Sequence, residues 1–112
     1  MNEPLFEKQK SQLLKYYQAI NEKDIEVIQS FLSVDVQVNF PDSSRNWQGI
    51  ECAREKFSLM YQRNPSFHAD ILNWSRPSSD SIILEVCFGE SSHPMQYFFD
   101  GPDCLISKIS HL

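Results

Sequence analysis

Few side chains in this sequence have the type and spacing that chemistry requires. His68 and Asp70 lie two residues apart in an expected extended segment, so both side chains point the same way. Such a pair could orient an imidazole as a general base, or it could be an exposed surface pair. Because a catalytic zinc site normally takes three protein ligands, we predict no metal site here.

Two tyrosines could offer hydroxyl groups to a ligand. Tyr16 could donate a hydrogen bond to a ligand oxygen, or its ring could pack in the core with the hydroxyl satisfied by backbone or water. Tyr97 shares a strand face with Met95 and Phe99 and could add a second polar group, or it could serve packing alone. We expect the Tyr16 hydroxyl to point into a pocket.

The other polar residues assemble no recognisable catalytic set, and the catalytic residues stay unknown. Asp42 follows Pro41, which favours a solvated turn carboxylate over a group at a pocket mouth. His93 is expected in a loop. Cys104 and His111 fall on opposite faces of one expected strand, so they cannot act as nucleophile and base.

Composition excludes several classes of function. The 112 residues carry a formal charge of -5 and no basic cluster, so we expect no nucleic-acid partner. Only three glycines and no phosphate loop are present, and we expect no cofactor. Without an apolar run of about 18 residues or a secretory signal, the expected location is cytoplasmic, with no membrane partner. Cys52, Cys87 and Cys104 form no Cys-x-x-Cys pair and are predicted to be buried thiols.

Hydrophobic periodicity predicts three helices. The first spans residues 5–21, the second is short and capped by Asp24, and the third follows Gly49 and ends at Asn64. Their predicted inner faces are Leu13, Leu14, Tyr17 and Ile20; then Val27, Ile28, Phe31 and Leu32; then Ile50, Ala53, Phe57, Met60 and Tyr61.

Alternation of apolar and polar residues predicts five strands. The first begins at Val36 and stops at Pro41, and four more cover about 67–74, 82–88, 95–99 and 104–111. Trp47 and Trp74 are expected either to cover the mouth of the barrel or to contact a ligand. A curved antiparallel sheet covered on its apolar concave side by three helices accommodates all these elements in one domain, residues 1–112.

This order of elements resembles the NTF2-like superfamily, which includes SnoaL-like cyclases and ketosteroid isomerases. The resemblance rests on the segment from Leu13 to Asp24, on Asp35 to Pro41, on Gly49 before the third helix, and on Asp100-Gly101 in the last hairpin. It implies an α+β fold shaped as a cone-like barrel, a pocket enclosed between sheet and helices, and a homodimer formed through the sheet.

The resemblance also implies where an isomerase site would lie. Tyr16 matches the helix-one tyrosine that holds the enolate oxygen, but Phe40 replaces the proton-shuttling aspartate and Met95 the protonated acid. Phe57 replaces a supporting tyrosine. A positioned base contributes about 10² to 10⁴ in rate and one oxyanion donor about 10² to 10³, so the isomerase mechanism is lost.

These substitutions turn the reaction centre apolar. The leading hypothesis is therefore a pocket that binds a small hydrophobic molecule, with Tyr16, Phe40, Phe57, Met95, Tyr97 and Phe99 as the predicted ligand-binding residues. The alternatives are a SnoaL-type enzyme acting on a cyclic ketone, and a dimeric protein-interaction module with a filled cavity. A cavity above about 300 Å³ with two or more polar groups would favour a ligand or substrate.

Overall fold

Apolar residues three and four positions apart give the chain its helices, as the sequence predicts. The structure is a computed structural model that describes residues 3–112. Its helices are α1 (Glu3–Glu22), α2 (Ile25–Ser30) and α3 (Ile50–Arg63). Asp24 caps α2, as predicted, by accepting a hydrogen bond from the Val27 N–H at 3.3 Å. Leu14 is about half exposed because it lies 100° around α1 from the buried Leu13.

The second helix is shorter than predicted. It ends at Ser30, and Leu32 is the first residue of strand β1 instead of the last residue of a helix. The Phe31 carbonyl accepts a hydrogen bond from the Ile106 N–H at 2.8 Å, so pairing with a distant strand replaces another helical turn. Val27, predicted on the inner face, is 41% exposed on this short helix.

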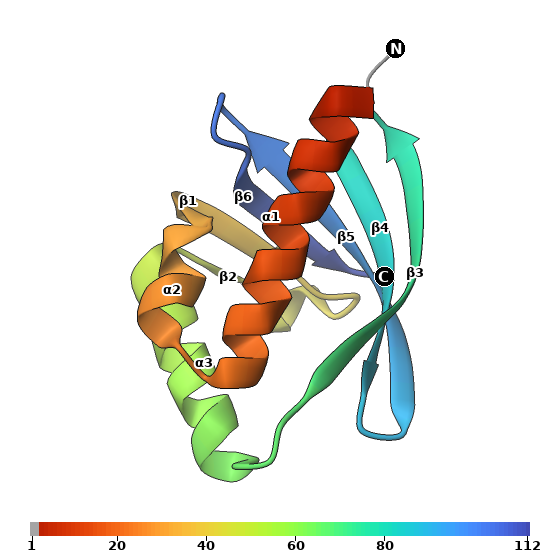
Figure 1. The fold of residues 1–112 in the computed structure, drawn as a ribbon. Coiled ribbons are helices and arrows are strands. Elements are labelled where there is room, and N and C mark those ends of the chain that lie inside the picture. Colours follow the sequence, from red (N-terminus) through yellow and green to blue (C-terminus); the bar gives the residue numbers. More distant parts are fainter. Residues whose placement is uncertain (1–2) are drawn as a thin grey trace.

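The strands form a six-stranded, curved sheet that does not close into a barrel (Figure 1). Their order is β2-β1-β6-β5-β4-β3, and every neighbouring pair is antiparallel except β1 and β6, which are parallel. The α+β fold class predicted from the sequence is confirmed. The strands are β1 (Leu32–Asn39), β2 (Trp47–Gln48), β3 (Ala69–Ser78), β4 (Ser81–Phe88), β5 (Ser91–Asp100) and β6 (Leu105–His111).

The sheet differs from the sequence expectation in several features. It is not wholly antiparallel, because β1 pairs in parallel with β6, and β1 begins at Leu32 instead of Val36, because Leu32 pairs with Ile106. The short strand β2 was not predicted because two residues show no period; it follows the short 3₁₀ helix Ser43–Arg45. His93, expected in a loop, lies within β5 because Val86 pairs with it across the β4–β5 hairpin.

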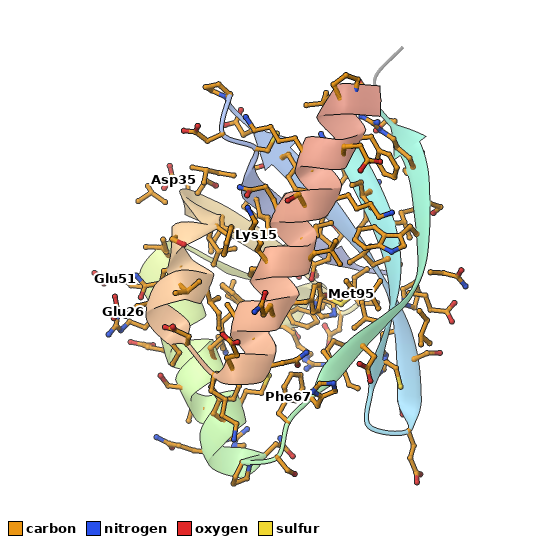
Figure 2. The ribbon with its side chains drawn as sticks, viewed as in Figure 1. Lys15, Glu26, Asp35, Glu51, Phe67 and Met95 are labelled. Atoms are coloured by element: carbon orange, nitrogen blue, oxygen red, sulfur yellow. The ribbon has the colours of Figure 1, made fainter. Side chains whose placement is uncertain are left out.

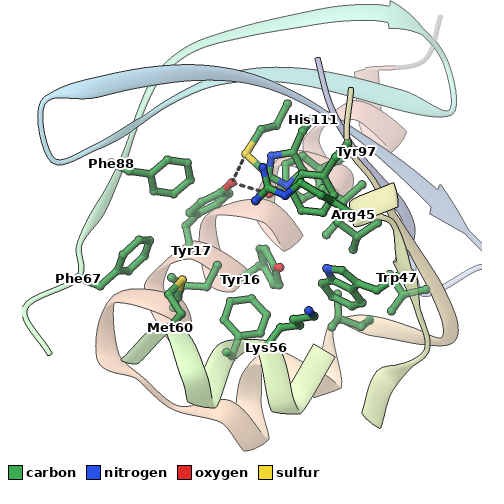
Figure 3. A pocket seen from close by; sticks show the side chains of 18 residues that line it. Tyr16, Tyr17, Arg45, Trp47, Lys56, Met60, Phe67, Phe88, Tyr97 and His111 are labelled. Carbon is green, nitrogen blue, oxygen red and sulfur yellow. Dashed lines mark hydrogen bonds between the residues drawn. The ribbon is translucent and has the colours of Figure 1, made fainter. Parts of the chain in front are cut away.

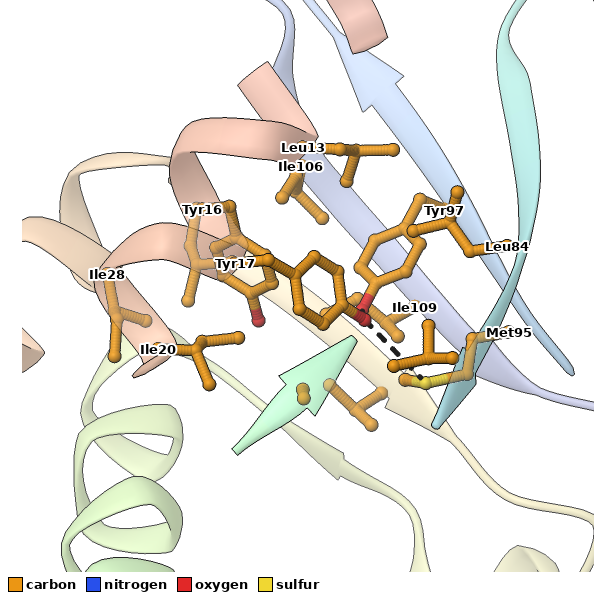
Figure 4. Close-up of a cluster of buried hydrophobic side chains, with 14 of the residues drawn as sticks. Leu13, Tyr16, Tyr17, Ile20, Ile28, Leu84, Met95, Tyr97, Ile106 and Ile109 are labelled. Atoms are coloured by element: carbon orange, nitrogen blue, oxygen red, sulfur yellow. Dashed lines mark hydrogen bonds between the residues drawn. The ribbon is translucent and has the colours of Figure 1, made fainter. Parts of the chain in front are cut away.

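The core lies between α1 and the concave face of the sheet (Figures 2 and 4). Helices α2 and α3 cover the β1 and β2 side, and α1 crosses toward β3. Alternate residues of the central strands point inward, which is why their burial follows the predicted period of two. The central buried residues are Leu13, Tyr16, Tyr17, Ile20, Ile82, Leu84, Val86, Met95, Tyr97, Ile106 and Ile109.

The three cysteines differ in burial. Cys104 is buried, but the prediction of buried thiols is wrong for Cys52 and Cys87, which are partly exposed. Cys52 lies 100° around α3 from the buried Ala53, and Cys87 alternates with the inward-facing Val86. None of the helices in residues 3–112 is both long and apolar enough to span a membrane.

One side chain fixes the end of α1 to the start of β3. The Asn21 amide donates to the Ala69 carbonyl at 2.9 Å and accepts from the Ala69 N–H at 2.8 Å. Ala69 is buried, so its backbone groups need these partners. The two bonds therefore set where the first helix lies relative to the outer strand.

We expect Asn21→Ala to lower the free energy of unfolding by about 2 to 3 kcal/mol, because it removes two hydrogen bonds and leaves a buried N–H unpaired. Urea unfolding measures the change. The control is Gln18→Ala, one turn earlier and exposed, which should change stability by less than about 0.5 kcal/mol. An equal effect of both substitutions would contradict the role of Asn21.

Candidate functional site

A cavity of about 330 Å³ lies between the concave face of the sheet and the helices (Figure 3). It exceeds the size at which a ligand or substrate becomes the favoured explanation, and several polar groups reach it. Its apolar lining is Ile20, Leu32, Val36, Val38, Phe40, Phe57, Met60, Phe67, Phe88, Met95 and Ile109. Its other lining residues are Tyr16, Tyr17, Tyr97, Trp47, Arg45, Lys56 and His111.

The structure brings most of the predicted ligand-binding residues to this one cavity. The residues that line it are Tyr16, Phe40, Phe57, Met95 and Tyr97. Phe99 does not line it and packs partly buried against the core instead. The pairing of β5 with β6 shifts register between Phe98 and Phe99, and Phe99 lies two residues along the strand beyond Tyr97. Contact between these residues and a ligand stays a prediction.

Tyr16 brings a hydroxyl group without a partner to the cavity. Its side chain is 2% exposed and its hydroxyl points into the cavity (Figure 3). Burial raises the pKa of Tyr16 well above its usual value, so the hydroxyl keeps its proton. Within residues 3–112 no hydrogen bond engages this hydroxyl, so it can donate to a molecule inside the cavity.

The other two buried tyrosines satisfy each other. The Tyr17 and Tyr97 hydroxyl oxygens are 2.5 Å apart, and the Tyr17 hydroxyl also lies 3.9 Å from the Met95 sulfur (Figure 4). The two contacts fit a chain in which Tyr97 donates to Tyr17 and Tyr17 donates to the weakly accepting sulfur. Burial raises the pKa of both tyrosines. Of this cluster, only the Tyr16 hydroxyl is free for a ligand.

His111 places an uncharged imidazole on the cavity wall. Its ring stacks on Phe40 with centroids 4.3 Å apart. Burial lowers the pKa of His111, and electrostatic interactions with His93 and Arg45 lower it further. The imidazole is therefore neutral at pH 7 and could accept a proton.

Two flexible cations also reach the cavity. The Arg45 guanidinium lies over the Phe40 ring at 4.7 Å, and Lys56 enters the lining from α3 (Figure 3). Both residues are exposed, which places them at the opening of the cavity, whereas Tyr16 is at its buried end.

Except for Trp47, the remaining sequence candidates lie outside the cavity. His68 and Asp70 form an exposed pair at 3.0 Å, the surface alternative considered above. Asp42 accepts hydrogen bonds from the N–H and hydroxyl of Ser44, which lower its pKa, and it is a solvated turn carboxylate as predicted. Trp47 lines the cavity and Trp74 does not. Among residues 3–112 no three His, Cys, Asp or Glu side chains are grouped as a metal site.

Sequence reasoning missed several cavity residues. His111 could have been found, because it alternates with Ile109 on the buried face of the last strand. Tyr17 was assigned to packing alone. Arg45 and Lys56 gave no signal, because a loop cation and a cation on the polar side of a helix usually stay in solvent.

No family model matches the chain, and no curated protein matches it in sequence. Solved structures do match its fold. A SnoaL-like protein of unknown function from Burkholderia thailandensis aligns over 94% of this chain and 92% of its own, with a TM-score of 0.82 and 16% identity. An NTF2-like protein of unknown function from Cytophaga hutchinsonii aligns over 93% and 88%, with a TM-score of 0.69 and 11% identity.

A third similar structure is an enzyme. SalBIII, an epoxide hydrolase/cyclase-like enzyme with a role in pyran ring formation in the polyether salinomycin, aligns over 100% of this chain and 93% of its own. The TM-score is 0.80 and the identity 14%. The resemblance to NTF2-like and SnoaL-like proteins is thus confirmed at the level of the fold. At these identities it assigns no activity to this chain.

We expect His111 to titrate with a pKa below its ordinary value of 6.5, followed by NMR of the imidazole protons against pH. Arg45→Gln should raise that pKa, whereas Lys108→Gln, on the same strand as His111, should leave it unchanged. Because the unfolded state binds this proton more readily, His111 should make the fold less stable as pH falls below 6.5. A pKa at or above 6.5 would contradict the buried placement.

Proposed function

We propose that this protein binds a small, mostly apolar molecule in the cavity between sheet and helices. The observation that carries the proposal is the Tyr16 hydroxyl, which is protonated, has no hydrogen-bond partner in residues 3–112, and faces an apolar space of about 330 Å³. The side chain is buried, but its hydroxyl oxygen is open to the cavity, so a ligand oxygen or an ordered water can accept its hydrogen bond there.

Size and lining support the same proposal. Ligand pockets for small molecules usually span about 300 to 1,000 Å³, with mostly hydrophobic walls and a few placed polar groups. The phenyl rings of Phe40, Phe57, Phe67 and Phe88 supply such walls. A filled interior, as expected of a pure interaction module, would leave no such space.

A fluorescent apolar probe tests this proposal. N-phenyl-1-naphthylamine is neutral and brightens in an apolar environment, so it should gain fluorescence with the native protein. Met60→Trp, which fills the cavity from α3, should reduce binding, and Leu59→Trp, its exposed neighbour, should not. Absence of probe binding to the folded native protein would favour the interaction module instead.

Tyr16→Phe should weaken a ligand that has a hydrogen-bond acceptor by about 1 kcal/mol, or roughly fivefold, while leaving the fold nearly unchanged. A matched pair of competitors isolates the effect. Displacement of the probe by 2-acetylnaphthalene should become weaker in the variant, whereas displacement by 2-ethylnaphthalene, which lacks the oxygen, should not. Equal displacement by the ketone in both proteins would remove Tyr16 from the site.

An enzymatic function is the second candidate, favoured by the neutral His111 imidazole on the wall of the cavity that holds the Tyr16 hydroxyl. An imidazole of this kind can take a proton from a carbon next to a carbonyl, and a tyrosine can hold the resulting oxygen. Exchange of the methyl protons of 2-acetylnaphthalene with D₂O, followed by NMR, separates the candidates. Exchange that depends on both residues supports an enzyme, and no acceleration supports binding alone.

We also expect a homodimer formed through the outer face of the sheet. Ile83 and Cys87 lie there partly exposed beside the exposed Glu85. Light scattering should give about twice the 13.1 kDa of one chain. Ile83→Lys should produce the monomer, whereas Val34→Lys, at a residue that is 69% exposed on β1, should not. A native protein that is already monomeric at micromolar concentration would contradict this expectation.

A further inference from the structure

We propose that the ligand is an organic acid, with an apolar body inside the cavity and a carboxylate at the opening beside Lys56 and Arg45. This inference rests on the proposed binding function and names the chemical class of its ligand. It follows from the charges around the cavity, which the apolar lining alone does not explain.

Neither cation at the opening forms a direct ion pair with a described residue. Within residues 3–112 neither the Lys56 ammonium nor the Arg45 guanidinium forms an ion pair, whereas Arg54, on the same helix as Lys56, pairs with Glu26 at 2.8 Å. Arg45 is held over the Phe40 ring at 4.7 Å, which keeps its guanidinium against the cavity wall.

No acidic side chain among the described residues lines the cavity to balance these charges. Asp42 is the nearest candidate, because the Arg45 charge contributes to lowering its pKa. Its Oδ1 accepts from the N–H and hydroxyl of Ser44, and no direct ion pair joins its carboxylate to Arg45 among the described residues. His111 stays neutral and adds neither a positive nor a negative charge to the cavity. The described residues that line the cavity thus carry two positive side chains and no negative one, in a chain whose formal charge is -5.

The distribution of groups selects among ligand types. An ammonium ligand would meet two like charges at the opening, and a neutral ligand would leave both cations unused. A carboxylate there would form charge-assisted hydrogen bonds while it remains partly solvated, which avoids the cost of burying an ion. The aromatic walls then take the hydrocarbon part of the same molecule.

Three compounds with the same ten-carbon chain test the head group directly. Decanoate, decan-1-ol and decylamine carry charges of about -1, 0 and +1 at pH 7. Each is used below its micelle concentration to displace N-phenyl-1-naphthylamine from the native protein. We expect decanoate to bind most tightly and decylamine least, with the preference for the acid decreasing as salt is added.

Variants that remove one positive charge each show which residues cause the preference for decanoate. Lys56→Gln and Arg45→Gln should each weaken decanoate by about threefold to tenfold and leave decan-1-ol unchanged. Arg54→Gln removes the same charge from α3 outside the cavity and is the matched control, expected to leave all three affinities unchanged. Unchanged probe binding in each variant shows that the cavity is intact.

The outcomes separate this inference from the function on which it rests. If decan-1-ol binds as tightly as decanoate, or if the control variant weakens decanoate as much as the other two, the acid proposal is overturned and apolar binding stands. If neither the probe nor any of the three compounds binds, the proposed function itself is overturned.

Discussion

The packing of α1 against the concave face of the sheet is the contact on which the rest of the structure depends. Three tyrosines make it: the Tyr16, Tyr17 and Tyr97 rings meet edge-on, with centroids 5.5 to 6.1 Å apart. The hydrogen bond between Tyr17 and Tyr97 ties helix to strand at the centre of that contact. Rigid aromatic rings cannot collapse to fill the space beside them as flexible side chains can. The cavity therefore lies along this contact.

The apolar residues Phe40 and Met95 contact polar groups on the cavity wall. Phe40 now supports His111 by stacking and Arg45 by a cation–π contact, and Met95 accepts the weak hydrogen bond of Tyr17. Phe40 and Met95 thus contact and hold neighbouring polar groups of the cavity. Because the same scaffold can hold different groups at these positions, shared fold does not transfer activity.

Much of the fold could be predicted from the sequence because its periodicities are local. The helical stripe around Leu13 and the alternation from Ile82 to Phe88 each indicate one buried face, and both occur in the structure, except that Leu14 of the predicted stripe is exposed. The errors arise where the secondary structure of a residue depends on its pairing with a strand that is distant in the sequence. Leu32 joins a strand because β6 lies alongside it, and β2 exists only because Trp47 pairs with Val38.

The candidate site was less predictable for a different reason. The resemblance placed Tyr16 and Phe40, because positions aligned by motif carry over to related folds. Lys56 and Arg45 carried no such signal, since a surface cation looks the same in sequence whether it faces open solvent or the opening of a cavity. Phe99 is the opposite case, a residue predicted in the site that lies outside it. Its alternation with Tyr97 predicted that both side chains point to the same face of the sheet, but the strand register shifts next to Phe99, which does not line the cavity.

The arrangement of polar groups along the cavity follows the cost of burying charge. The neutral hydroxyls of Tyr16 and Tyr97 lie at the buried end, where burial raises their pKa values and keeps them protonated. His111, which is partly buried on the cavity wall, is uncharged for the same reason. Among the described lining residues, full charges occur on Lys56 and Arg45 alone, and both side chains stay exposed, where their charges can be hydrated. A ligand that is neutral at its inner end and anionic at its outer end would match this gradient without requiring the fold to bury an ion.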